Sequence, residues 1–139
     1  MGCSPSVENQ ISFINLIGQD KPEEAEVYFK WYHSTDWIHR CRCDATNTDK
    51  ISAFWVAISN NAYKSLEMLM KKIGSKFIHH MLIRFDRKGK QDGIHTPLTF
   101  CMSRNDFRGG SIILKNDILG QQMVMSYKQH FPNELINKK

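Results

Sequence analysis

One ten-residue pattern occurs twice in the chain, and this internal repeat constrains the fold more than any other feature. The copies run from Ser52 to Asn61, "SAFWVAISNN", and from Thr96 to Asn105, "TPLTFCMSRN". Each opens with a small hydroxyl residue, continues with apolar residues at helical spacing and closes on Asn. An apolar cluster follows each copy and predicts a second helix. Because a helix pair cannot bury its apolar face alone, the repeat predicts an all-α fold, a short helical solenoid of antiparallel helix pairs.

The rest of the chain also reads as helices separated by polar turns. Two helices are expected before His33, with Ser4 capping the first, and Asp20 and Glu23 fitting a capping box for the second. From Thr35 to Asp49 the helical pattern breaks and ends in a polar run that begins at Asp44, so this stretch reads as a connector. A length of 139 residues corresponds to one domain with a single core.

The second copy resembles the signature of the ankyrin-repeat family, T-P-L-H-x-A. Thr96, Pro97 and Leu98 keep its first three letters, and Cys101 stands where the family has Ala; in the first copy Ala57 keeps that Ala. The resemblance implies that a Thr or Ser caps a short inner helix, that Pro suits its first turn, and that the small residue lets neighbouring repeats approach closely. It also implies core positions at Phe54, Ala57, Leu98 and Cys101.

The chain departs from the family in its spacing and in its glycines. The second copy follows the first after 44 residues, whereas the family repeats about every 33. Gly109 and Gly110 fall where a second helix begins, and Gly weakens a helix there. We therefore expect a single ankyrin-like domain over 1–139, divided into an N-terminal capping helix pair (5–34), a repeat (45–75), an insertion (76–94), a second repeat (95–117) and a C-terminal helix (118–139).

The resemblance also implies a binding surface. In ankyrin repeats the short inner helix lines a concave face, and its polar end and the preceding turn point toward a partner protein. Transferred by position, the implied protein-binding residues are Asp49, Ile51, Ser59, Asn60, His95, Ser103 and Arg104. The alternative for each is a solvated surface residue without a partner.

Net charge favours no particular class of partner. The chain carries a formal charge of +5 with an isoelectric point near 9.1, but its basic residues form no dense tract. A basic loop at 84–90 holds Arg84, Arg87, Lys88 and Lys90 and is interrupted by Asp86. Nucleic-acid binding by this loop is the alternative function, although a charged loop is usually only solvated.

Other motifs are weaker still. Gly2 fits the pattern for N-myristoylation, and Cys3 is a candidate for palmitoylation, so a membrane is an expected partner only if these residues are acylated. The four cysteines are expected to be reduced thiols, and the segment from His39 to Cys43 lacks the second ligand pair of a zinc site. No cofactor or metal site is expected. No P-loop, nucleophile elbow, zinc-protease or dinucleotide-binding motif is present in the sequence, so no enzyme is expected.

These observations favour a protein-protein interaction module that acts as an adaptor, an inhibitor or a pathogen effector. No stretch approaches the roughly 20 apolar residues of a membrane span, and a cytoplasmic location is expected, in the host cytosol if the chain is a secreted effector. The use of Lys, Asn and Ile is typical of an AT-rich genome, and small free-standing ankyrin proteins of this kind resemble those directed by pathogens at host proteins. With so few repeats, self-association is a further way to complete the core.

Overall fold

The computed structural model describes residues 5–46, 48–73, 83–84 and 94–117, and this part of the chain is mainly helical, as the sequence predicts. Two short antiparallel hairpins join β1 (Cys41–Arg42) to β2 (Lys50–Ile51) and β3 (Ile83–Arg84) to β4 (Ile94–His95). The helices are α1 (Val7–Gly18), α2 (Pro22–Trp31), the 3-10 helix η1 (Asp36–His39), α3 (Ala53–Ser59), α4 (Tyr63–Ile73), α5 (Pro97–Ser103) and α6 (Phe107–Asn116).

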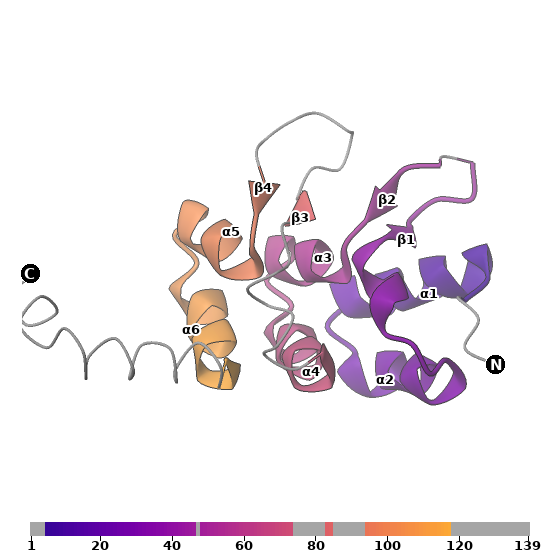
Figure 1. The fold of residues 1–139 in the computed structure, drawn as a ribbon, viewed down its shortest axis with the longest axis horizontal. Helices are drawn as coiled ribbons and strands as arrows, with labels where there is room; N and C mark the ends of the chain where they lie inside the picture. The colour runs from indigo at the N-terminus through magenta and orange to yellow at the C-terminus, as the bar shows by residue number, and fades with distance from the viewer. Residues whose placement is uncertain (1–4, 47, 74–82, 85–93, 118–139) are drawn as a thin grey trace, which may run out of the picture.

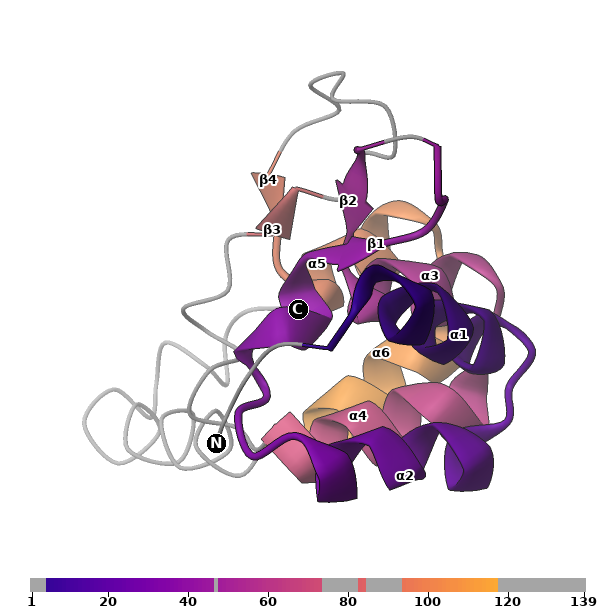
Figure 2. The ribbon, with the colours of Figure 1, turned by 90° about the vertical axis from the view of Figure 1, so that its right-hand side faces the viewer.

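The helices form three pairs that lie side by side in chain order: α1 with α2, α3 with α4, and α5 with α6 (Figure 1). The first helices of the pairs contact one another, α1 with α3 and α3 with α5, and the second helices do the same. Seen along the row of pairs, the second helices form one layer, the first helices lie above them, and both hairpins extend beyond the first helices (Figure 2). The face made by the first helices and the hairpins is called the hairpin face below.

The same turn joins the two helices of every pair. Its second residue has a positive φ, at Asp20 (61°), Asn61 (55°) and Asn105 (57°), a conformation that Asp and Asn tolerate better than other non-glycine residues. The next amide then donates to a carbonyl five residues earlier, as in a Schellman turn. These three hydrogen bonds join Lys21 N to Leu16 O, Ala62 N to Ala57 O and Asp106 N to Cys101 O. The N-terminal pair thus has the turn geometry of the two pairs that contain the repeated pattern.

The core runs between the two helix layers through the first two pairs and reaches the third. Three of the residues expected there, Phe54, Ala57 and Cys101, are fully buried, while Leu98 is only half-buried because it lies on the outer side of the last described pair. An aromatic cluster closes the first pair, where the ring of Phe13 lies 4.7 Å from that of Trp37, edge to face. Aromatic contacts of this kind stabilise a core beyond the area that they bury.

Two local expectations at helix N-termini are wrong. The first helix starts at Val7 and is capped by Ser6, not by Ser4, because the Ser6 Oγ accepts from Asn9 N at 3.2 Å. Asp20 does not cap α2, whose cap residue is Lys21. The Oδ1 of Asp20 instead accepts from Ser65 N at 2.9 Å, at the start of α4 in the next pair.

The glycines do not prevent α6 from forming. The helix begins at Phe107 and runs through Gly109 and Gly110, which are both buried. Asp106 offsets their low helix propensity, because its Oδ1 accepts from Gly109 N at 2.9 Å and caps the helix.

The connector and the insertion contain the two hairpins. The expected connector from Thr35 to Asp49 holds η1 and β1, while β3 and the first residue of β4 belong to the insertion at 76–94. The rest of that insertion and the helix expected at 118–139 lie outside the described residues. No helix in the described part of the chain is long and apolar enough to cross a membrane.

Candidate functional site

Four of the residues predicted to bind a partner lie at the polar ends of the two short first helices. Ser59 and Asn60 end α3, and Ser103 and Arg104 end α5, so that each pair of residues occupies the same place in its repeat. The two ends are joined, because an Arg104 guanidinium nitrogen donates to the Ser59 carbonyl at 3.4 Å. The structure therefore brings these four residues together at one edge of the hairpin face.

Two of these side chains also have a structural role. The Asn60 amide donates to the Val56 carbonyl at 2.8 Å, and the Ser103 hydroxyl donates to the Phe100 carbonyl at 2.8 Å. Both carbonyls also accept a backbone amide of the last turn, from Asn60 N at 3.1 Å and Arg104 N at 3.3 Å, so each side chain adds a second donor at the helix end. Arg104, whose side chain is exposed, is the member of the set with charge to offer to a partner.

Ile51 corrects the sequence prediction, which placed it on the exposed surface. Its side chain is 6% exposed. The residue pairs with Cys41 in the first hairpin, and since side chains alternate across a strand, the neighbouring Lys50 is exposed instead. Asp49, just before this strand, is half-buried.

The remaining predicted residues are only partly described or lie outside the described part. His95 pairs with Ile83 across the second hairpin, and its side chain is outside the description. Gly2 and Cys3, the candidate acylation sites, lie outside the described residues, as do 85–90 of the basic loop; Arg84 is in β3.

A groove of about 320 Å³ lies between α1, α3 and the first hairpin. Gly18 allows the two helices to approach, because a Cβ there would meet the Val56 Cγ1 at 3.3 Å. The lining combines apolar side chains with amides, which suits a peptide or a protein loop that offers both apolar groups and backbone hydrogen bonds. The lining residues are Ile14, Asn15, Gly18, Gln19, Cys43, Ile51, Trp55, Val56 and Asn60.

An aromatic strip extends from this groove across α3 and α5. The rings of Trp55 and Phe100 stack at 6.5 Å with an interplanar angle of 23°, and the Arg104 guanidinium carbon lies 5.6 Å from the centre of the Phe100 ring. Both rings are half-buried. We call Trp55, Phe100 and Arg104 the aromatic strip. Trp, other aromatics and Arg are the residue types enriched at the energetic centres of protein interfaces.

Sequence reasoning missed two members of this strip. The repeated pattern does not single out Trp55, and it treats Phe100 only as one of its apolar residues. The signal that could have found them is a Trp at a position where helical spacing does not require a core residue.

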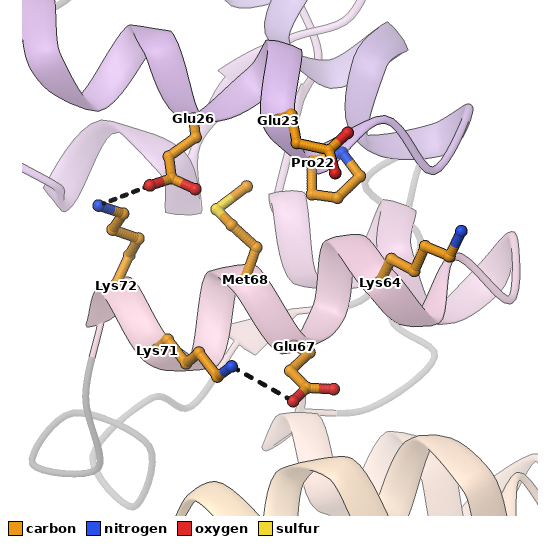
Figure 3. A pocket seen from close by; sticks show the side chains of 8 residues that line it. All are labelled: Pro22, Glu23, Glu26, Lys64, Glu67, Met68, Lys71 and Lys72. Atoms are coloured by element: carbon orange, nitrogen blue, oxygen red, sulfur yellow. Dashed lines mark ion pairs between the residues drawn. The ribbon is translucent and has the colours of Figure 1, made fainter.

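A second groove of about 540 Å³ lies on the other layer, between α2 and α4 (Figure 3). Its three acidic and three basic side chains balance, and four of them form ion pairs: Lys72 Nζ lies 3.1 Å from Glu26 Oε2, and Lys71 Nζ lies 3.5 Å from Glu67 Oε1 (Figure 3). Exposed pairs of this kind add little stability and leave no single sign of charge to attract a partner. The groove is therefore a weaker candidate than the hairpin face.

His39, Cys41 and Cys101 do not form a shared catalytic or metal-binding site. Burial lowers the pKa of His39 against the opposing effect of Asp36, and its ring stacks on Phe54 at 6.2 Å. Burial raises the pKa of Cys41 to about 12, and burial followed by the Asp106 charge raises that of Cys101 to about 12, so both thiols are protonated at neutral pH. Among the described residues, no three His, Cys, Asp or Glu side chains are grouped to hold a metal ion.

The hairpin face, with its groove and its aromatic strip, is thus the candidate site. Its definition rests on the geometry of this chain. Comparison with protein-family models, with characterised proteins and with solved structures finds no match.

Proposed function

We propose that the chain is a small ankyrin-like solenoid that binds a partner protein through its hairpin face, and that it acts by binding rather than by catalysis. Each ankyrin repeat consists of a turn followed by two helices. Two of the three pairs described here follow a hairpin, and all three share one turn geometry between their helices. The short first helices, of 7 residues in α3 and α5 against 11 and 10 in α4 and α6, support the same architecture.

The observation that carries the proposed activity is the aromatic strip. Trp55, Phe100 and Arg104 place two stacked rings and a guanidinium on the face where this architecture binds partners. The adjoining groove of about 320 Å³ supplies room for a side chain or a loop of the partner. Rigid aromatic area next to a charged group gives affinity at a low cost in conformational entropy.

The test is capture of partners from a cytosolic extract by the native chain and by variants of the strip. Arg104→Glu reverses the charge, and Trp55→Ala removes half of the stack. Because truncation of an interface hot spot costs about 2 kcal/mol or more, each change should reduce the amount of captured partner roughly 30-fold. Lys71→Glu, on the groove between α2 and α4, is the matched charge control and should capture as the native chain does.

Equal capture by all variants would contradict the assignment of the hairpin face. Each variant must keep the native melting temperature, so that lost capture reports on the surface and not on folding. Capture that disappears after nuclease treatment or at high salt would favour the nucleic-acid alternative, because phosphate contacts weaken steeply as salt rises.

A further inference from the structure

The outer side of the last described pair carries an apolar groove. It has a volume of about 390 Å³ and is lined by α5, α6 and the turn that joins them. These two helices are the last described pair, and α3 and α4 pack on one side of them (Figure 1). Met102 and Phe107 at this groove are 65% and 81% exposed, which is unusual for large apolar side chains that lie close together. The lining residues are Leu98, Met102, Asn105, Asp106, Phe107, Gly110, Ser111 and Leu114.

The repeat shows what happens to these positions elsewhere in the chain. The residues 44 positions before Leu98, Met102, Gly110 and Leu114 are all buried in the middle pair, which another pair follows. They are Phe54, Ile58, Leu66 and Met70, with exposed fractions of 0%, 0%, 0% and 1%. In the middle pair, these positions are covered by a neighbouring element. In the last described pair, the same positions form the open groove.

Gly110 gives this face room for such an element. It stands where the middle pair has Leu66, and a Cβ built on it would meet only Leu98 Cδ1 at 3.7 Å and Cys101 Cβ at 3.9 Å, which are ordinary contacts. The helix backbone at 110 therefore lies at the floor of the groove without a side chain to fill it. An apolar side chain from outside fits that space.

We propose that residues 118–139 of this chain occupy the groove and cover the outer side of the last described pair. They follow α6 directly, so the tether holds them at a millimolar effective concentration next to the groove. Their sequence has an apolar residue at every fourth position, which gives one stripe if the segment is helical. The stripe consists of Leu119, Met123, Tyr127 and Phe131.

The opposite side of the same segment is mostly polar. Gln121, Gln122, Lys128 and Gln129 share it with Ile118 and Met125. Terminal elements of stacked repeat proteins need a polar outer face to remain soluble. A segment with one apolar stripe and one mostly polar side meets that need. The proposal does not depend on the binding activity proposed for the hairpin face.

Hydrogen exchange of the 139-residue chain, followed by mass spectrometry, tests the proposal. Amides within 118–131 should exchange at least about tenfold more slowly than in a free peptide of the same sequence, because docking shields them. Met102→Asp places a charge in the groove and should remove that protection, whereas Met102→Leu should keep it. Trp31→Asp, at an exposed position of α2 in the first pair, is the matched control and should keep it as well.

Two kinds of result would overturn the proposal, one from 118–131 itself and one from the dependence on protein concentration. One is exchange of 118–131 at the free-peptide rate in the native chain, or the same protection in Met102→Asp as in the native chain. The other is protection of the groove that falls on tenfold dilution of the protein, which would assign the groove to a second copy of the chain. Slow exchange of the α3 amides in every variant shows that the fold is intact.

Discussion

The middle and last helix pairs carry the same ten-residue pattern and the same turn, yet their second helices are capped in different ways. The amide of Ser65 at the start of α4 donates to Asp20, which belongs to the preceding pair. The equivalent amide of Gly109 in α6 donates to Asp106 of its own pair, and the Tyr63 hydroxyl of the preceding pair donates to the same oxygen at 2.9 Å. Neighbouring pairs are therefore joined at this corner in both cases, although the cap itself comes from a different pair.

The two pairs also distribute side-chain volume differently. Where the middle pair has Ala57 in the first helix and Ser65 in the second, the last pair has Cys101 and Gly109. All four residues are buried. A larger side chain in one helix is thus accompanied by a smaller one in the other, which keeps the spacing of close-packed helices.

The largest difference between the pairs should appear when equivalent core residues are truncated. Phe54→Ala removes a fully buried ring and should lower the free energy of unfolding by about 3–5 kcal/mol. Leu98→Ala, at the equivalent position of the last pair, removes a smaller side chain than Phe54→Ala and should cost less, about 2–3 kcal/mol. Urea denaturation measures both values.

Equal losses for the two variants would break this comparison. They would show that the last pair loses as much packing with Leu98 as the middle pair loses with the larger ring of Phe54. Val7→Ala, at an exposed position of α1, serves as the control and should change the free energy of unfolding by less than about 0.5 kcal/mol.

A smaller effect should follow from filling Gly109. A Cβ there would lie 2.5 Å from Asp106 Oδ2 and 3.0 Å from Cys101 Sγ, so Gly109→Ala should cost about 1–3 kcal/mol. In a Cys101→Ala background the sulfur is absent, and the last pair has the same residue at this position as the middle pair has at Ala57. The cost of Gly109→Ala should then fall, and a double-mutant cycle measures the coupling.

The size of that coupling distinguishes the two contacts. A cost that is unchanged in the Cys101→Ala background would place the conflict at Asp106 alone, and it should then come with loss of the hydrogen bond from Tyr63. Gly110→Ala is the matched control, since a Cβ at 110 makes only ordinary contacts.

The sequence predicted the parts of the fold that depend on local pattern. The second helix predicted after each copy of the pattern is present, as α4 and α6. Ser52 and Thr96 cap α3 and α5, as the resemblance implied, through bonds from Phe54 N and Thr99 N. The two hairpins were missed, because strands of two residues carry too little alternation to be recognised.

The site was harder to predict, because it depends on contacts between distant residues. Burial of Ile51 follows from its pairing with Cys41 across a loop, and the stack of Trp55 on Phe100 joins two pairs. A propensity for turns placed Asp20 correctly between two helices, but its hydrogen bond to Ser65 crosses 45 residues. A local sequence pattern cannot predict a hydrogen bond between residues that are so far apart in the sequence.

The smallest expected effect concerns that last contact and separates the two modes of capping. Asp20→Gly keeps the positive φ but removes the oxygen that accepts from Ser65 N, so it should cost about 1 kcal/mol and raise amide exchange in the first turn of α4. Asp20→Asn keeps both the conformation and an acceptor oxygen, and should change little. Asp106→Gly should instead affect the first turn of α6 and leave α4 protected. If Asp20→Gly loosened α2 and not α4, the cap would act within its own pair, and the contrast between the two pairs would be lost.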